Sequence, residues 1–94
     1  MSKDDNVQQG FVVRGRVQGV GYRYWVARLA RRHDMAGTAR NTADGAVEVH
    51  VRGPEADMPR FEARLLEGPF SARVTSVTRT ESDQDLPLEF WILG

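Results

Sequence analysis

A glycine-rich segment, Gly15–Arg23, combines the residue types that bind an anion. It follows an apolar run at Phe11–Val13, which predicts a strand, and it leads into Tyr22–His33, where apolar residues recur at helical spacing. The first N–H groups of a helix lack internal partners and carry partial positive charge, and glycines let the backbone approach a bound group closely. Because Arg23 lies in the first helical turn, its planar guanidinium is placed to bind phosphate oxygens.

This segment does not match the commoner phosphate-binding motifs. The residues after Gly19 and Gly21 do not provide the Gly-Lys-Ser/Thr of a P-loop. A dinucleotide fingerprint needs a third glycine three residues after the second, where this chain has Tyr24. The purely structural alternative is a tight strand-to-helix turn that carries a surface arginine.

The segment Gly15-Arg16-Val17-Gln18-Gly19-Val20-Gly21-Tyr22-Arg23 closely resembles the signature of the acylphosphatase family. Gly37–Asn41 is similar to the second motif of that family, although Thr38 stands where the family usually has an aromatic residue and Ala39 where it has valine. The residues from Asp44 to Pro54 resemble the hairpin that follows. The resemblance covers residues 9 to 93, which is nearly the whole chain.

This resemblance implies a hydrolase that cleaves small acyl phosphates into carboxylate and inorganic phosphate by in-line attack of water, without a metal or a cofactor. Arg23 matches the phosphate-binding arginine of the family, and Asn41 matches the water-positioning asparagine. The phosphate-binding loop would consist of Gln18, Gly19, Val20, Gly21, Tyr22 and Arg23. Inorganic phosphate or sulfate would compete with the substrate. From the residues alone, Asn41 has a second interpretation as a turn residue, because it lies shortly before Asp44-Gly45.

The composition narrows the functional class. The formal net charge is zero, which argues against a nucleic-acid binder, since those proteins are usually basic. Between Phe11 and Arg40, however, there are seven arginines and a single acid, Asp34, and this local excess suits a small anionic substrate. No apolar run is long enough to span a bilayer, the first nine residues do not form a signal peptide, and cysteine is absent. We therefore expect a cytoplasmic monomer without a membrane partner.

The order of the expected elements predicts a fold. We expect strands at Phe11–Val17, 38–41, Val47–Arg52, Arg73–Thr80 and Leu88–Leu93, and helices at Tyr22–His33 and from Pro54 to Gly68. The hairpin signal at Asp44-Gly45 separates the second strand from the third. The uneven spacing of Val74 and Val77 indicates a bulge. This is the ferredoxin-like βαββαβ pattern of an α+β protein, with two helices on one face of a four-stranded antiparallel sheet.

Periodicity also predicts the core and the domain organisation. We expect one domain at residues 9–94, preceded by a flexible segment at residues 1–8. The expected core consists of Phe11, Val13, Val26, Leu29, Val49, Phe61 and Leu65, and Leu66 belongs to the apolar stripe of the second helix. His33 and His50 lack the spacing of metal ligands, and the alternation of the third strand places His50 on its polar face.

Two further functional classes compete with the hydrolase. One is a catalytically idle acylphosphatase-like binding module, or a stand-alone form of the module that resembles acylphosphatase in hydrogenase maturation factors, because the same fold serves many roles. The other is an RNA-recognition domain, which would need exposed aromatic residues on its central strands. The third expected strand, Val47–Arg52, contains none.

Overall fold

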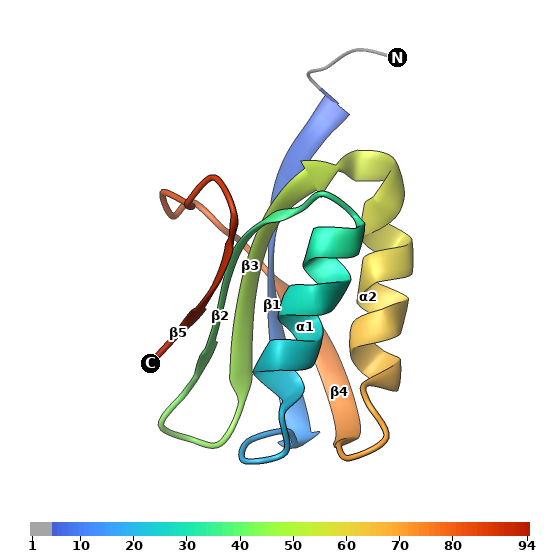
Figure 1. The fold of residues 1–94 in the computed structure, drawn as a ribbon, viewed down its shortest axis with the longest axis vertical. Helices are drawn as coiled ribbons and strands as arrows, with labels where there is room; N and C mark the ends of the chain where they lie inside the picture. Colours follow the sequence, from blue (N-terminus) through green and yellow to red (C-terminus); the bar gives the residue numbers. More distant parts are fainter. Residues whose placement is uncertain (1–4) are drawn as a thin grey trace.

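A single mixed sheet organises the protein, and two helices cover one of its faces (Figure 1). The computed structural model describes residues 5–94. In chain order the elements are β1 (Asn6–Arg16), α1 (Tyr22–Arg32), β2 (Ala36–Asn41), β3 (Val47–Pro54), the 3-10 turn η2 (Glu55–Asp57), α2 (Met58–Glu67), β4 (Arg73–Thr80) and β5 (Phe90–Leu93).

The strands lie in the order β4-β1-β3-β2-β5. The first four pair antiparallel, in the arrangement of the ferredoxin-like α+β fold, which confirms the predicted fold class. The expectation of a four-stranded, wholly antiparallel sheet is wrong in one respect: β5 adds a fifth strand that runs parallel to β2. The chain reaches this edge because the segment Glu81–Glu89 crosses the helix-free face of the sheet, so that β5 arrives in the same direction as β2 (Figure 1).

The core lies between the sheet and the two helices. All seven residues expected in the core are buried, with exposed fractions of 0–4%. The ring centroids of Phe11 and Phe61 lie 6.0 Å apart and join β1 to α2. The inward-facing valines of β1 and β3 alternate with more exposed residues because side chains along a strand point alternately to the two faces.

Several boundaries differ from the sequence expectation. β1 begins at Asn6 rather than Phe11, because its first residues pair with the end of β3 as far as Pro54. Pro54 precedes η2 instead of opening the second helix, and α2 begins at Met58.

Leu66 of the second helix is exposed, so it does not belong to the apolar stripe as expected. The expected bulge is present, since Arg14 faces Ser76 but Gly15 faces Val74, which leaves Thr75 without a partner. The predicted flexible segment at residues 1–8 lies partly outside the described residues.

His50 lies on the face of β3 that the sequence predicts, but it is buried there. Alternation along β3 does place it on the helix-free face, but only 5% of the residue is exposed. Its Nδ1 atom lies 2.6 Å from the hydroxyl of Ser82, which belongs to the crossing segment. Gln8 donates a hydrogen bond to the same hydroxyl over 2.9 Å. His50 is therefore on the face that the sequence predicts, but the crossing segment covers it and buries it there.

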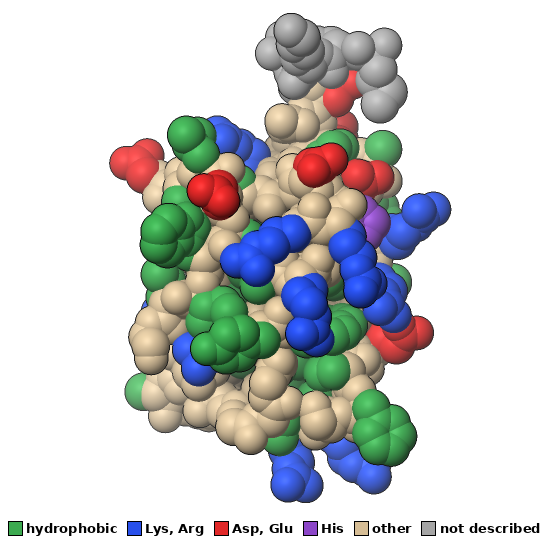
Figure 2. Space-filling view, in the orientation of Figure 1, with side chains coloured by type: hydrophobic (Ala, Val, Ile, Leu, Met, Phe, Trp, Pro, Cys, Tyr) green, Lys and Arg blue, Asp and Glu red, His purple; other side chains and the backbone are tan. Residues whose placement is uncertain are grey.

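Three connections meet at one end of the sheet, at the bottom of Figure 1. They are the β1–α1 loop with the glycine-rich segment, the β2–β3 hairpin that follows Asn41, and the α2–β4 turn. In the same orientation, acidic side chains lie mostly toward the opposite end, whereas Lys and Arg side chains are spread over the visible face and some extend from the lower end (Figure 2). Among the described residues, no helix is long and apolar enough to cross a membrane.

Candidate active site

The β1–α1 loop presents backbone amides at the start of α1. Gly19 and Gly21 have φ values of 74° and 80°, which glycine adopts without steric cost. Gly21 is the N-cap of α1, and no side chain caps this helix end. The amides from Gln18 to Arg23 donate no hydrogen bond to any residue that the structure describes. The loop therefore leaves several donors, together with the positive end of the helix dipole, available to an anion.

Arg23 lies in the first turn of α1, as expected, and is half-buried. Its Nη1 atom donates a hydrogen bond over 2.8 Å to the backbone carbonyl oxygen of Leu93, at the end of β5. A guanidinium has five N–H donors in a fixed plane, so this bond holds the group and leaves other donors for a ligand. The structure thus brings Arg23 to the end of the sheet where the glycine loop lies. The role of Leu93 was not apparent in the sequence.

Gln18 belongs to the glycine loop, but its side chain is turned toward the β2–β3 hairpin. Its Nε2 atom donates to the carbonyl oxygens of Thr42 and Ala46, both over 2.8 Å. These two carbonyls flank the hairpin turn that directly follows Asn41. The Gln18 side chain therefore ties the glycine loop to the hairpin and fixes the position of one relative to the other.

Asn41 is the last residue of β2 and lies opposite Val47. Its side chain forms no hydrogen bond within residues 5–94, and its Oδ1 atom is buried without a partner. A buried, unpaired polar atom costs about 1–3 kcal/mol, so this side chain does not stabilise the fold through polar contacts. The structure brings Asn41 next to the hairpin that Gln18 holds.

The turn after Asn41 is stabilised by other residues. The hydroxyl of Thr42 donates to the Asp44 carboxylate and accepts a hydrogen bond from the amide of Ala46 over 3.0 Å. The amide of Thr42 also donates to the carbonyl oxygen of Ala46 over 2.9 Å. Because Thr42 and Asp44 make the polar contacts of the turn, the interpretation of Asn41 as a turn residue gains no support from the geometry.

Asp44 is the carboxylate of this hairpin. The hydrogen bond from Thr42, followed by the hydrogen bond and charge of Arg14, lowers the pKa of Asp44 below its ordinary value. Nη1 of Arg14 lies 3.0 Å from the carboxylate in an exposed ion pair. The Asp44 charge near the glycine loop is therefore matched by a neighbouring arginine.

The other side of the glycine loop is supported from α2 and the α2–β4 turn. The hydroxyl of Tyr22 is buried and donates to the carbonyl oxygen of Leu65 over 2.7 Å. Burial raises the pKa of Tyr22, so the phenol stays neutral and keeps this bond. Ser71 donates to the carbonyl oxygen of Val20 over 2.7 Å. Sequence reasoning found no role for Ser71, because its partner is 51 residues away in the chain.

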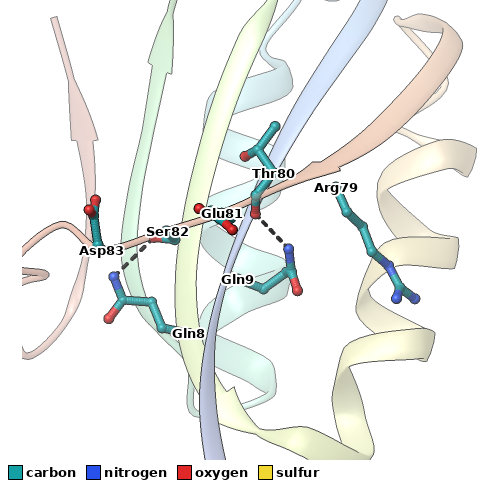
Figure 3. A pocket seen from close by; sticks show the side chains of 7 residues that line it. All are labelled: Gln8, Gln9, Arg79, Thr80, Glu81, Ser82 and Asp83. Atoms are coloured by element: carbon teal, nitrogen blue, oxygen red, sulfur yellow. Dashed lines mark hydrogen bonds between the residues drawn. The ribbon is translucent and has the colours of Figure 1, made fainter.

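A hollow of about 590 Å³ lies at the other end of the sheet, where β1 begins and β4 ends. Figure 3 shows its lining, which includes the carboxylates of Glu81 and Asp83. Those two charges make it a poor site for an anionic substrate. Within residues 5–94, no three His, Cys, Asp or Glu side chains are grouped as metal ligands would be.

Comparisons with known proteins find relatives of this chain in both sequence and structure. A family model described as Acylphosphatase matches residues 9–92. The chain is 48% identical over 73 residues to the acylphosphatase of Nitrobacter hamburgensis, covering 78% of this chain and 74% of that protein. The crystal structure of acylphosphatase from Bacillus subtilis has a TM-score of 0.80 at 37% identity and covers 93% of this chain and 98% of its own. The structure of an acylphosphatase from Coxiella burnetii has a TM-score of 0.89 at 26% identity, with coverages of 99% and 100%.

Proposed function

The chain belongs to the acylphosphatase family and is an acyl phosphate hydrolase, and we propose that its catalytic residues are Arg23 and Asn41. The glycine loop, Gln18–Arg23, binds the phosphoryl group through its backbone amides. Arg23 adds a fixed positive charge, and Asn41 orients the attacking water. The comparisons lend no support to the alternative of an idle binding module.

The chemistry asks little of the protein beyond positioning and charge. In an acyl phosphate, the bond between phosphorus and the acyl oxygen breaks, and the carboxylate departs with the electron pair. A water oxygen bonds to phosphorus from the opposite side, and the proton that it releases passes to a phosphate oxygen or to solvent. Because a carboxylate is a good leaving group, no general acid is needed. Preorganised donors and in-line placement then supply most of the rate enhancement.

The free amide of Asn41 is the observation that supports its role best. An amide side chain offers both a donor and an acceptor, which suits a water that must be held in one orientation. Asn41 makes no hydrogen bond to a described residue, and Gln18 connects its hairpin to the glycine loop. A structural asparagine would instead bond its own turn, as Thr42 does here.

The decisive experiment is hydrolysis of benzoyl phosphate by the purified protein in the presence of a metal chelator. We propose a metal-free reaction, so the chelator should leave the rate unchanged. Arg23→Ala and Asn41→Ala should both lower the rate, whereas the matched controls Arg28→Ala, at an exposed position of α1, and Asn6→Ala, at the exposed start of β1, should not. Activity lost to the chelator and restored by magnesium would reject the metal-free mechanism.

Two further parts of the proposal concern binding and assembly. Inorganic phosphate or sulfate should inhibit competitively by occupying the glycine loop. Rates that do not respond to high phosphate would count against that assignment. The expected monomeric state and cytoplasmic location stay predictions, which sedimentation and cell fractionation would test.

A further inference from the structure

The glycine loop is bordered by two turns of opposite character. On one side lies the β2–β3 hairpin, which Gln18 holds and which is polar, with Thr42 and the Asp44 carboxylate. On the other side lies the α2–β4 turn, which Ser71 holds through its 2.7 Å hydrogen bond to the carbonyl oxygen of Val20. For a substrate whose phosphoryl group sits in the loop, these two turns are neighbouring surfaces on which its acyl group can pack.

The α2–β4 turn presents an aromatic side chain that the fold does not use. Phe70 is fully exposed, at 108% of its reference area, and is the most exposed large apolar residue described. It directly precedes Ser71, and adjacent Cα atoms lie about 3.8 Å apart, so the backbone of Phe70 lies close to the loop that Ser71 contacts. Its ring packs on no part of the core, which leaves both faces free for a ligand.

The backbone around Phe70 is well fixed. The amide of Gly68 donates to the carbonyl oxygen of Arg64 over 2.9 Å, and the amide of Ala72 donates to the carbonyl oxygen of Pro69 over 3.0 Å. The second bond closes a turn with Phe70 and Ser71 at its two central positions. Such positions do not call for a large apolar side chain. An aromatic side chain held on a tight turn loses little conformational freedom when a ligand packs on it.

We propose that Phe70 is a specificity-determining residue that packs against the acyl group of the substrate and favours aromatic acyl phosphates over small aliphatic ones. The inference rests on the proposed binding of the phosphoryl group by Gln18–Arg23. The opposite turn is polar, with Thr42 and the Arg14–Asp44 ion pair, so an apolar acyl group packs better against Phe70. The ring of Phe70 then covers one face of the acyl group and removes apolar surface from water.

The test compares kcat/KM for benzoyl phosphate and acetyl phosphate in the wild-type protein and in Phe70→Ala. The ratio of the two values should fall about 3- to 10-fold in the variant, equivalent to about 0.7–1.4 kcal/mol at about 1.4 kcal/mol per tenfold. Aromatic pairs contribute in this range. Phe70→Tyr should keep the wild-type ratio. The control is Leu88→Ala, which removes another highly exposed apolar side chain, on the segment that leads into β5.

Each outcome decides the proposal. A ratio that falls in Phe70→Ala but not in Leu88→Ala supports the packing role. A ratio that stays within twofold of wild type overturns it, and so does an equal loss for both substrates, which would make Phe70 a support of the turn. Wild-type protein that hydrolyses neither substrate would instead refute the proposed phosphoryl site, and this result is distinct from an unchanged ratio.

Discussion

The guanidinium of Arg23 and the backbone carbonyl of Leu93 are joined by a hydrogen bond of 2.8 Å across 70 residues of sequence. This bond links the start of α1 to the last residue of β5. It orients a long, flexible side chain before any substrate arrives, and preorganised charge of this kind stabilises a transition state without further rearrangement. The last strand of the chain therefore supports the residue to which we give the central binding role.

Replacing Arg23 should weaken binding of the phosphoryl group. We expect Arg23→Ala to lower kcat/KM by about 10²–10³-fold, the range for one preorganised electrostatic group. Arg23→Lys should recover little, because an ammonium cannot bond the Leu93 carbonyl and a phosphate with the same planar geometry. Steady-state kinetics with benzoyl phosphate test this. Near-full activity of the lysine variant would show that positive charge alone is sufficient.

Loosening β5 should affect the same site indirectly. Phe90 is 2% exposed and anchors β5, whereas Phe61 is fully buried in α2 and packs against Phe11. Both Phe90→Ala and Phe61→Ala should lower the free energy of unfolding by about 3–5 kcal/mol, measured by urea denaturation. Only Phe90→Ala should also raise KM in the folded state, because Arg23 loses its fixed partner. Equal KM values in the two variants would show that β5 does not position Arg23.

Asn41 should matter for turnover rather than for anion binding. We expect Asn41→Ala to lower kcat by about 100-fold or more, while inhibition by phosphate stays within about threefold of wild type. Asn41→Asp should be no better, because it loses the NH₂ donor and adds negative charge beside an anionic substrate. If Asn41 were only a turn residue, aspartate would be well tolerated. An Asn41→Asp enzyme with near-normal kcat would therefore rule out the water-positioning role.

Gln18 should couple the glycine loop to the hairpin. Gln18→Glu places a carboxylate against the carbonyl oxygens of Thr42 and Ala46, which cannot donate to it. We expect this variant to lose about 1–3 kcal/mol of stability and to be more impaired in kcat than Gln18→Met, which keeps the length without the charge. Gln84→Ala, at an exposed position, serves as the control. Wild-type stability and kcat in Gln18→Glu would show that the hydrogen bonds between Gln18 and the hairpin contribute nothing to stability or catalysis.

The hairpin should respond to acid through Asp44. Its pKa lies below the ordinary 3.8, first because of the Thr42 hydrogen bond and then because of Arg14. A carboxylate with a depressed folded-state pKa stabilises the fold above its unfolded pKa, and this contribution is lost as pH falls through the folded value. We expect the Ala46 amide signal to titrate with a midpoint below 3.8 in NMR spectra, and Asp44→Asn to remove the transition. A midpoint at or above 3.8 would contradict the Thr42–Asp44–Arg14 arrangement.

Much of this protein follows from local sequence pattern. The glycine-rich segment, the helical spacing after Tyr22 and the Asp44-Gly45 turn depend on backbone preferences within a few residues. The seven expected core residues were correct for the same reason, because periodicity states which side chains share a face. The order of elements then restricts the topology to very few alternatives, and the ferredoxin-like fold was among them.

The tertiary structure alone decided which distant segments meet. No local sequence pattern predicts that β5 runs parallel to β2, that the crossing segment covers His50, or that Ser71 bonds Val20. Exposure of a strand face depends on whatever packs over it, and a hydrogen bond between residues 51 or 70 apart depends on how the whole chain closes. Arg23 and Asn41 could therefore be predicted as candidate catalytic residues from the sequence. The hydrogen bond that holds Arg23, and the lack of one from the Asn41 side chain to any residue in 5–94, were determined by long-range packing.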